Sequence, residues 1–174
     1  MDNPTSFTLS DGVIKWEIYS NENKICSRFS SSEWNLITSL VDSDDEFETL
    51  VSQNNFINCY ILKHFKTDAP IAFVLTMNIG LKVDKVFIHG GGWGKSMRLS
   101  LLYYRGMILM IEYLLKQSYK IRSSCLITNT RAFRFLHSLG FVKYCTTKTH
   151  HYMWINEKRL RASKIYEYLY PPIL

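Results

Sequence analysis

The stretch NTRAFRFLHSLGF, residues 129–141, contains the local signals that decide the fold of this chain. It predicts a helix from Thr130 to Leu139 between two strands. Asn129 ends the first strand, and Ala132 is small where the helix meets a sheet. Gly140 suits the left-handed backbone that ends many helices, and Phe141 opens the next strand into the core. The sequence therefore predicts a strand–helix–strand unit here.

The sequence on either side of this unit predicts a mixed α/β (α+β) domain. Ser30 and Glu33 form a capping-box pattern, which predicts a helix through Leu40 and Val41. Helices are also expected over 44–51, from Met97 or Leu99 to Gln117, and from Glu157 to about Leu169. The predicted strands are Val13–Tyr19, Phe56–His64, Pro70–Asn78, Lys85–His89, Ile121–Thr128, Phe141–Thr147 and His150–Ile155. Hairpins combined with strand–helix units imply a mixed central sheet of about six to seven strands, with helices on both faces and an extra helix at the C-terminal end.

Composition is consistent with one globular domain spanning residues 1–174. The chain is 47% hydrophobic, which suits one packed core. The first residues do not resemble a signal peptide. The longest apolar run, Met107–Ile111, is too short to span a membrane. The four cysteines are widely spaced, which is typical of reduced cysteines in a cytoplasmic protein or inside a virion.

Charge divides the chain into two halves of opposite sign. Residues 1–80 contain 5 Lys or Arg and 11 Asp or Glu, whereas residues 81–174 contain 16 and 4. A basic half suggests an anionic partner, either a phosphorylated cofactor or nucleic acid. An ordinary solvated basic surface is the alternative.

The order of elements and the residue 129–141 stretch resemble the GNAT (Gcn5-related N-acetyltransferase) superfamily. Asn129, Ala132, Gly140 and Phe141 match the family pattern N-x-x-A-x-x-x-Y-x-x-x-G-F. The resemblance is strongest over residues 56–155. It implies a GNAT-like fold and acetyl-CoA as cofactor. A weaker resemblance is to phage-encoded members, some of which are small internal virion proteins, so a virion is the alternative to the cytoplasm.

The glycine-rich stretch between a predicted strand and a buried helix is the candidate cofactor site. The family's Q/R-x-x-G-x-G/A pattern should fall at 102–107, where Arg105 and Met107 occupy the glycine positions. A P-loop is excluded because its first glycine would be His89. Glycines let backbone approach phosphate closely, and basic or hydroxyl side chains add contacts; a flexible turn without ligand is the alternative. The predicted cofactor-binding residues are Gly90, Gly91, Gly92, Trp93, Gly94, Lys95, Ser96, Arg98, Asn129 and Arg131.

The catalytic residues that the resemblance implies are only partly present. Many family members carry a Tyr that protonates the departing thiolate, and Leu136 occupies that position. His89, at the end of a strand, is the candidate base, because its ordinary pKa suits proton abstraction from an amine. A histidine bonded to backbone is the alternative. Direct attack of the amine on the thioester needs mainly positioning and an oxyanion donor.

Three functions follow from the sequence. The first is an acetyl-CoA-dependent N-acetyltransferase acting on an unidentified amine. The second is a catalytically degenerate GNAT-like structural or partner-binding protein, with a phage virion component as one form of it. Partners considered for the chain also include a second copy of itself, as a homodimer, or a virion protein. The third is a nucleic-acid binder, suggested by the basic half and by aromatics that core packing also explains: Trp93, Tyr103, Tyr104, Tyr152, Trp154, Tyr166, Tyr168 and Tyr170. No metal site is predicted, since His150 and His151 alternate along a strand; zinc with Cys145 is the alternative.

Overall fold

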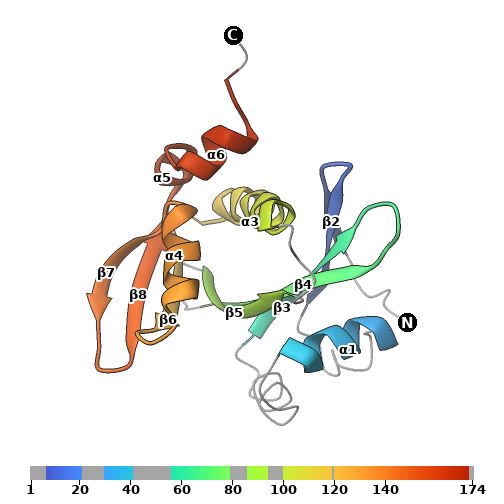
Figure 1. The fold of residues 1–174 in the computed structure, drawn as a ribbon, viewed down its shortest axis with the longest axis horizontal. Coiled ribbons are helices and arrows are strands. Elements are labelled where there is room, and N and C mark those ends of the chain that lie inside the picture. Colours follow the sequence, from blue (N-terminus) through green and yellow to red (C-terminus); the bar gives the residue numbers. More distant parts are fainter. Residues whose placement is uncertain are drawn as a thin grey trace. The chain divides into compact units, whose positions relative to one another are not determined.

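A computed structural model of the chain describes residues 7–20, 30–40, 56–78, 86–93, 100–118 and 120–172 (Figure 1). The strands are β1 (Phe7–Ser10), β2 (Ile14–Ser20), β3 (Phe56–His64), β4 (Pro70–Asn78), β5 (Val86–Trp93), β6 (Ile121–Leu126), β7 (Val142–Thr146) and β8 (His150–Ile155). The helices are α1 (Ser31–Leu40), α3 (Ser100–Leu115), α4 (Thr130–Ser138), α5 (Glu157–Arg161) and α6 (Lys164–Leu169). Among these residues no helix has both the length and the hydropathy that crossing a bilayer requires.

The chain divides into two compact units. The first contains residues 1–78 and 89–109, and the second contains residues 79–88 and 110–174. Strand β5 and helix α3 therefore each contribute to both units. The single domain spanning residues 1–174 stays a prediction.

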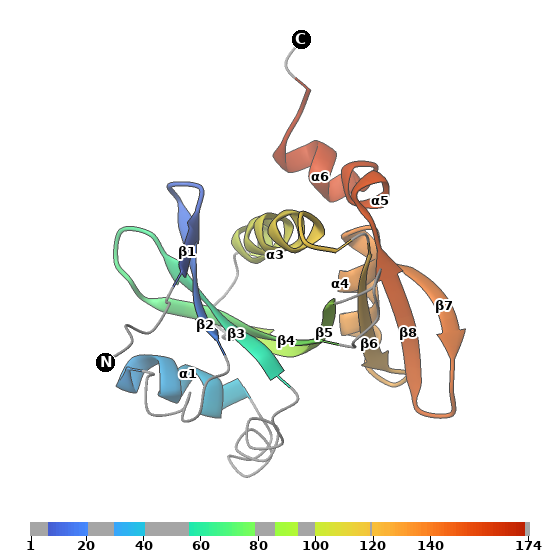
Figure 2. The same cartoon turned by 180° about the vertical axis from the view of Figure 1, so that it is seen from behind.

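The first unit contains an antiparallel sheet with a helix on each face. Strand β2 pairs with β1 and β3, and β3 also pairs with β4. The first half of α3 packs on the face that carries Trp16 and Leu62, where the Trp16 indole Nε1 donates to the Gly106 carbonyl over 2.7 Å. A Cβ on Gly106 would lie 2.9 Å from Leu62 Cδ2, so glycine allows the close approach of this helix. Helix α1 contacts β4, and Figures 1 and 2 show it on the other side of these strands.

The second unit combines a parallel pair of strands with antiparallel pairs. The start of β5 runs parallel to β6, from Val86↔Ile121 to Ile88↔Ser123, and the Ser123 hydroxyl donates to the Ile88 carbonyl over 3.0 Å. Strand β8 pairs antiparallel with both β6 and β7. The predicted α+β architecture with a mixed sheet is therefore confirmed, as are the helices on both faces of a sheet.

The residue 129–141 stretch folds as its sequence predicts. The Asn129 side chain accepts a hydrogen bond from the Ala132 N–H over 2.9 Å and caps α4. Gly140 has φ +99°, and a Cβ there would lie 2.5 Å from the Arg159 carbonyl oxygen. Leu136 and Phe141 are buried. Each residue that carried the fold prediction, apart from half-buried Ala132, thus has a specific contact that explains it.

Three element predictions are wrong in detail. The described residues form eight strands, one more than the seven predicted. The additional strand is the short β1. The predicted helix from Glu157 to about Leu169 is two helices, because the Ser163 hydroxyl accepts from the Tyr166 N–H and starts a new helix. Strand β5 continues to Trp93 instead of ending near His89. The expected helix over 44–51 lies outside the described residues, as do Met97 to Leu99.

Candidate functional site

The predicted cofactor-binding glycines lie mostly within a strand. Gly90, Gly91 and Gly92 belong to β5 instead of forming a turn. A run of glycine signals a turn in sequence, yet glycine also adopts extended backbone freely. Inside a strand it marks places where a ligand or another backbone approaches closely. Residues Gly90 to Gly92 therefore form a stretch of strand backbone without side chains, which suits a ligand that approaches closely.

The remaining residues of this predicted site are only partly described. His89 and Trp93 lie at either end of the glycine run in β5. Gly94, Lys95, Ser96 and Arg98 lie outside the described residues, between β5 and the first residue of α3, Ser100. His89 and the glycine-rich stretch that follows it lie within residues 89–109, which belong to the first unit.

Asn129 and Arg131, the other two predicted cofactor residues, lie together at the start of α4 in the second unit. Both are exposed. The Asn129 Oδ1 atom is already engaged by the Ala132 N–H, so helix capping explains this residue. An exposed helix start with a nearby guanidinium remains suited to an anion.

Leu136 occupies the position at which the family pattern has a tyrosine, and its side chain is buried. It belongs to the core of the second unit and supplies neither a proton nor a hydrogen bond. Its neighbour His137 is exposed and stacks on Phe133, with ring centroids 6.2 Å apart. The structure thus explains Leu136 by packing.

A pocket of about 730 Å³ lies at the other end of α4, within the second unit. It is lined by His137, Ser138, Gly140, Phe141, Val142, Arg159, Ala162, Ser163, Lys164 and Ile165. None of the predicted site residues lines it. Helix α4 has nine residues, so at 1.5 Å per residue its two ends are roughly 13 Å apart. The pocket is therefore separate from the exposed helix start at Asn129.

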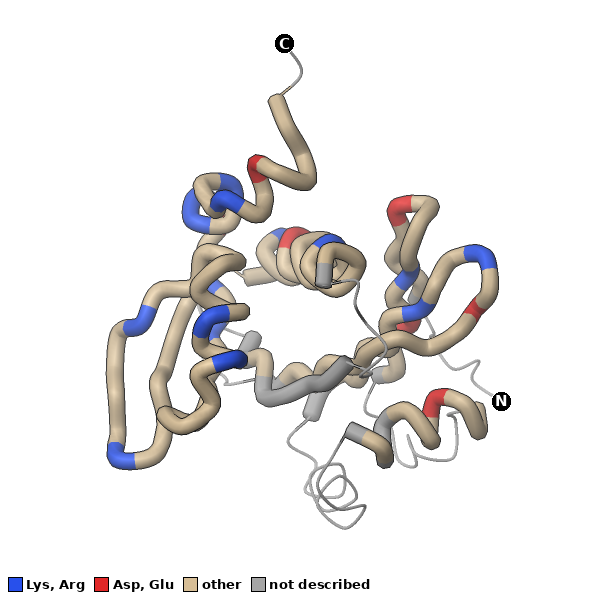
Figure 3. The backbone as a smooth tube through the Cα atoms, viewed as in Figure 1, with Lys and Arg blue, Asp and Glu red and all other residues tan. Residues whose placement is uncertain are grey.

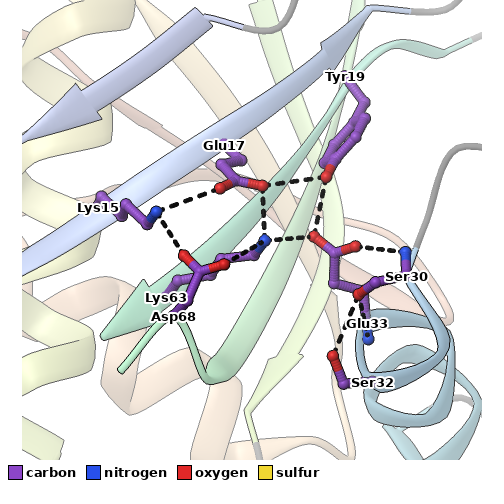
Figure 4. A network of polar contacts seen from close by, with 8 residues as sticks. All are labelled: Lys15, Glu17, Tyr19, Ser30, Ser32, Glu33, Lys63 and Asp68. Carbon is purple, nitrogen blue, oxygen red and sulfur yellow. Dashed lines mark hydrogen bonds and ion pairs between the residues drawn. The ribbon is translucent and has the colours of Figure 1, made fainter. Parts of the chain in front are cut away.

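A buried polar cluster in the first unit was not predicted from the sequence (Figure 4). The Lys63 ammonium lies 2.6 Å from Glu17 Oε2 and 2.8 Å from Glu33 Oε1. The Tyr19 hydroxyl donates to Glu33 over 2.8 Å. Lys63 and Glu33 are only 6% and 2% exposed. Asp68 lies 3.8 Å from Lys63 at the solvent side of the cluster.

The protonation states in this cluster are fixed by the contacts. Burial alone would raise the pKa of the Glu33 carboxyl, but hydrogen bonds from Lys63, Ser30 and Tyr19 outweigh burial and lower its pKa. Burial would lower the pKa of Lys63, and Glu17 and Glu33 outweigh it and raise that pKa. Burial and the Glu33 carboxylate raise the pKa of Tyr19. Glu33 and Lys63 therefore carry opposite charges near pH 7 and the Tyr19 hydroxyl stays protonated, which keeps their contacts in place.

Comparison with solved structures defines the class of fold. The chain has the fold of GNAT acetyltransferases: a GNAT-family acetyltransferase from Bacillus anthracis aligns with TM-score 0.60 and 13% identity, over 87% of this chain and 99% of that one. No protein-family model matches the sequence, and a search of curated proteins gives no significant match.

Two further solved acetyltransferase structures also align with this chain. Mycobacterium smegmatis RimJ, in complex with CoA-disulfide, aligns with TM-score 0.63 and 10% identity over 97% of this chain and 96% of that one. The ribosomal-protein-S5-alanine acetyltransferase from Vibrio fischeri aligns with TM-score 0.58 and 13% identity, over 88% and 98%. At these identities the likeness establishes the fold.

Proposed function

We propose that this chain is an N-acetyltransferase that transfers an acetyl group from acetyl-CoA to an amine. The observation that carries the proposal is the sequence of β5, with its run of glycines, followed by helix α3 within a fold shared with acetyltransferases. One of those neighbours contains a CoA derivative. The amine that this chain accepts is unidentified, because a fold does not select a substrate.

Most of the residues proposed to hold the cofactor belong to β5 or to the connection between β5 and α3. The backbone of Gly90 to Gly92 allows close approach of a ligand, and we expect the positive charges of Lys95 and Arg98 to favour the diphosphate. Gly94 and Ser96 belong to the same connection. Trp93 ends the strand, and Asn129 with Arg131 lies at the start of α4. When bound, acetyl-CoA supplies the activated acetyl group.

His89 is proposed as the base that accepts a proton from the acceptor amine. It is the residue directly before the glycines of β5. An imidazole has an ordinary pKa of about 6.5, so it is neutral and able to accept a proton at pH 7 and above. The thiolate that leaves would take its proton from water, since Leu136 supplies none.

A catalytically degenerate protein with the same fold is the second candidate function. Buried Leu136 favours it, because this position of the family pattern usually holds the proton donor. Such a protein would bind a partner, or a second copy of itself, and a virion component is one form of it. It would perform no acyl transfer.

Cofactor binding is tested first, by thermal unfolding of the full chain with 1 mM acetyl-CoA. A ligand at about 100 times its Kd stabilises the native state by about 2.7 kcal/mol, which raises Tm by roughly 5 to 10 °C for a chain of this size. The Lys95→Ala variant should lose most of this shift. Lys116→Ala removes an exposed lysine after α3 and serves as the matched control. An unchanged Tm in the wild type would reject both binding and activity.

Turnover is tested next, by release of free CoA thiol with a panel of amines, including peptides with a free N-terminus. His89→Gln should lower kcat about 10²- to 10⁴-fold and flatten the rise of activity with pH that a basic imidazole produces. His137→Gln, at an exposed histidine of α4, should leave both unchanged. Cofactor binding without turnover on any amine would favour the degenerate protein.

A further inference from the structure

One face of the second unit's sheet carries aromatic and basic side chains on three neighbouring strands. We name it the aromatic–basic face. Its members are Lys120, Arg122, Tyr144, His150, Tyr152, Trp154 and Arg159. They come from the approach to β6, from β6 itself, from the β7–β8 hairpin and from α5.

Strand register places Arg122, Tyr152 and Trp154 on one side of the sheet, and ring contacts with Tyr152 and Arg122 bring Tyr144 to the same side. Arg122 of β6 lies opposite Trp154 of β8, and Ser124 lies opposite Tyr152. Alternate residues of a strand point to opposite faces. The residues between them, such as Met153, are therefore on the other face, and Met153 is completely buried. That other face also receives α4, since Phe133 contacts the His151 ring at 5.0 Å.

The aromatic–basic face is accessible. Tyr144 is 48% exposed, and Arg122, His150, Tyr152 and Trp154 are half-buried. Neighbouring side chains on this face partly shield one another, which accounts for their intermediate exposure. Core packing was the alternative explanation for Tyr152 and Trp154. It does not fully account for these two side chains, because both are partly exposed.

Cations lie against two of the rings on this face. The Lys120 ammonium lies 4.9 Å from the centre of the Trp154 ring and the Arg159 guanidinium lies 4.7 Å from it. The Arg122 guanidinium lies 5.6 Å from the Tyr144 ring. The Tyr152 ring continues the row, 6.4 Å from Tyr144 and 6.2 Å from His150. Trp154 and Tyr144 thus each have a cation against the ring, and Tyr152 lies beside Tyr144.

The charge around this face is strongly positive. Residues 110–174 contain eleven Lys or Arg and three acids. Figure 3 shows Lys and Arg on α5 and the β7–β8 hairpin, where Asp and Glu are scarce. Two of the three acids are engaged: Glu157 pairs with Arg161, and Glu112 accepts from the Tyr166 hydroxyl. No acid belongs to the face as defined.

We propose that the aromatic–basic face binds single-stranded nucleic acid. Rings exposed on a sheet stack with unpaired bases, and flanking cations contact the phosphates. A duplex keeps its bases stacked on one another and offers no free base surface to Tyr144 or Trp154. The proposal is independent of acyl transfer, because it uses none of the residues assigned to the cofactor or to catalysis.

The experiment is fluorescence anisotropy with the full chain and labelled rU12, dT12 and a 12-base-pair duplex at several salt concentrations. The two single strands should bind more tightly than the duplex, and binding should weaken steeply with salt. Tighter binding of rU12 points to single-stranded RNA as the ligand, and tighter binding of dT12 points to single-stranded DNA. Equal binding means that the face recognises bases and phosphates without distinguishing the sugar. Tyr144→Ala should weaken binding about 5- to 150-fold, the range measured for one lost base stack. Tyr144→Phe keeps the ring and should bind normally.

Matched controls separate this face from general positive charge. Arg122→Ala should reduce the slope of log K against log salt by about 0.7, the value for one phosphate contact with a single strand. Lys116→Ala makes the same charge change outside the face and should leave the slope unchanged. Tyr168→Ala removes an exposed ring on α6 and should leave the affinity unchanged. Absence of binding at 50 mM salt, equal affinity for the duplex, or equal losses for Tyr144→Ala and Tyr168→Ala would each overturn the proposal.

Discussion

Replacing Gly140 by alanine tests how tightly the turn after α4 packs against α5. The glycine has φ +99°, and a new Cβ would lie 2.5 Å from the Arg159 carbonyl oxygen. A left-handed backbone costs an ordinary residue about 1–2 kcal/mol. Overpacking against atoms that cannot rotate away typically adds about 1–3 kcal/mol. The expected loss in the free energy of unfolding is therefore about 2–5 kcal/mol.

Gly12 supplies a matched control for the backbone cost alone. It has φ +86°, and a Cβ there would meet nothing within 4 Å. Gly12→Ala should therefore lose only about 1–2 kcal/mol. The difference between the two variants isolates the contact with Arg159.

Urea denaturation gives the total loss for each variant, and hydrogen–deuterium exchange assigns it to a unit. Gly140→Ala should increase exchange in α4, β7 and α5, whereas Gly12→Ala should affect the turn between β1 and β2. Equal losses for the two alanines would refute the reasoning, since the close contact at Gly140 would then have no energetic consequence.

Three further predictions concern the first unit. Lys63→Met should destabilise the protein by about 3–5 kcal/mol, because it leaves the buried Glu33 charge unpaired; adding Glu33→Gln should recover part of the loss in urea denaturation, and a strictly additive double variant would contradict the pairing. The lowered pKa of Glu33 means that its stabilisation is full above the ordinary carboxyl pKa of about 4.3 and is lost as pH falls further. Urea midpoints should therefore drop less below pH 4 in Glu33→Gln than in the wild type, and parallel curves would argue against this. Trp16→Phe removes the donor to the buried Gly106 carbonyl and should cost about 1–3 kcal/mol, also read from urea midpoints; a loss below about 0.5 kcal/mol would mean that water replaces the indole.

Local signals in the sequence predicted most of the fold. The capping box is present, with the Ser30 N–H donating to Glu33 Oε2 over 2.6 Å. Asn129 and Gly140 begin and end α4 as predicted. These features succeed because each depends on residues three or four apart. The β5 extension could not be predicted, because glycine is depleted in strands and a run of it favours a turn.

The polar cluster was missed for a different reason. Glu17 and Lys63 are 46 residues apart in sequence, and only the register of β2 with β3 brings them together. Lys63 directly follows the apolar run Cys59–Leu62 in β3, and this is the one signal that could have indicated a buried charge. The candidate cofactor site is still a set of predictions, resting on its place between β5 and α3.

Glu33 takes part in a local and a distant contact with different atoms of one carboxylate. Oε2 accepts from the Ser30 N–H at the start of its own helix, while Oε1 accepts from Lys63 on the sheet. This arrangement fixes the rotation of α1 about its own axis, because turning the helix would break one contact or the other. An aspartate, one methylene shorter, could not span both partners. Helix α1 and strand β3 should therefore unfold in a single cooperative step, with this side chain linking them.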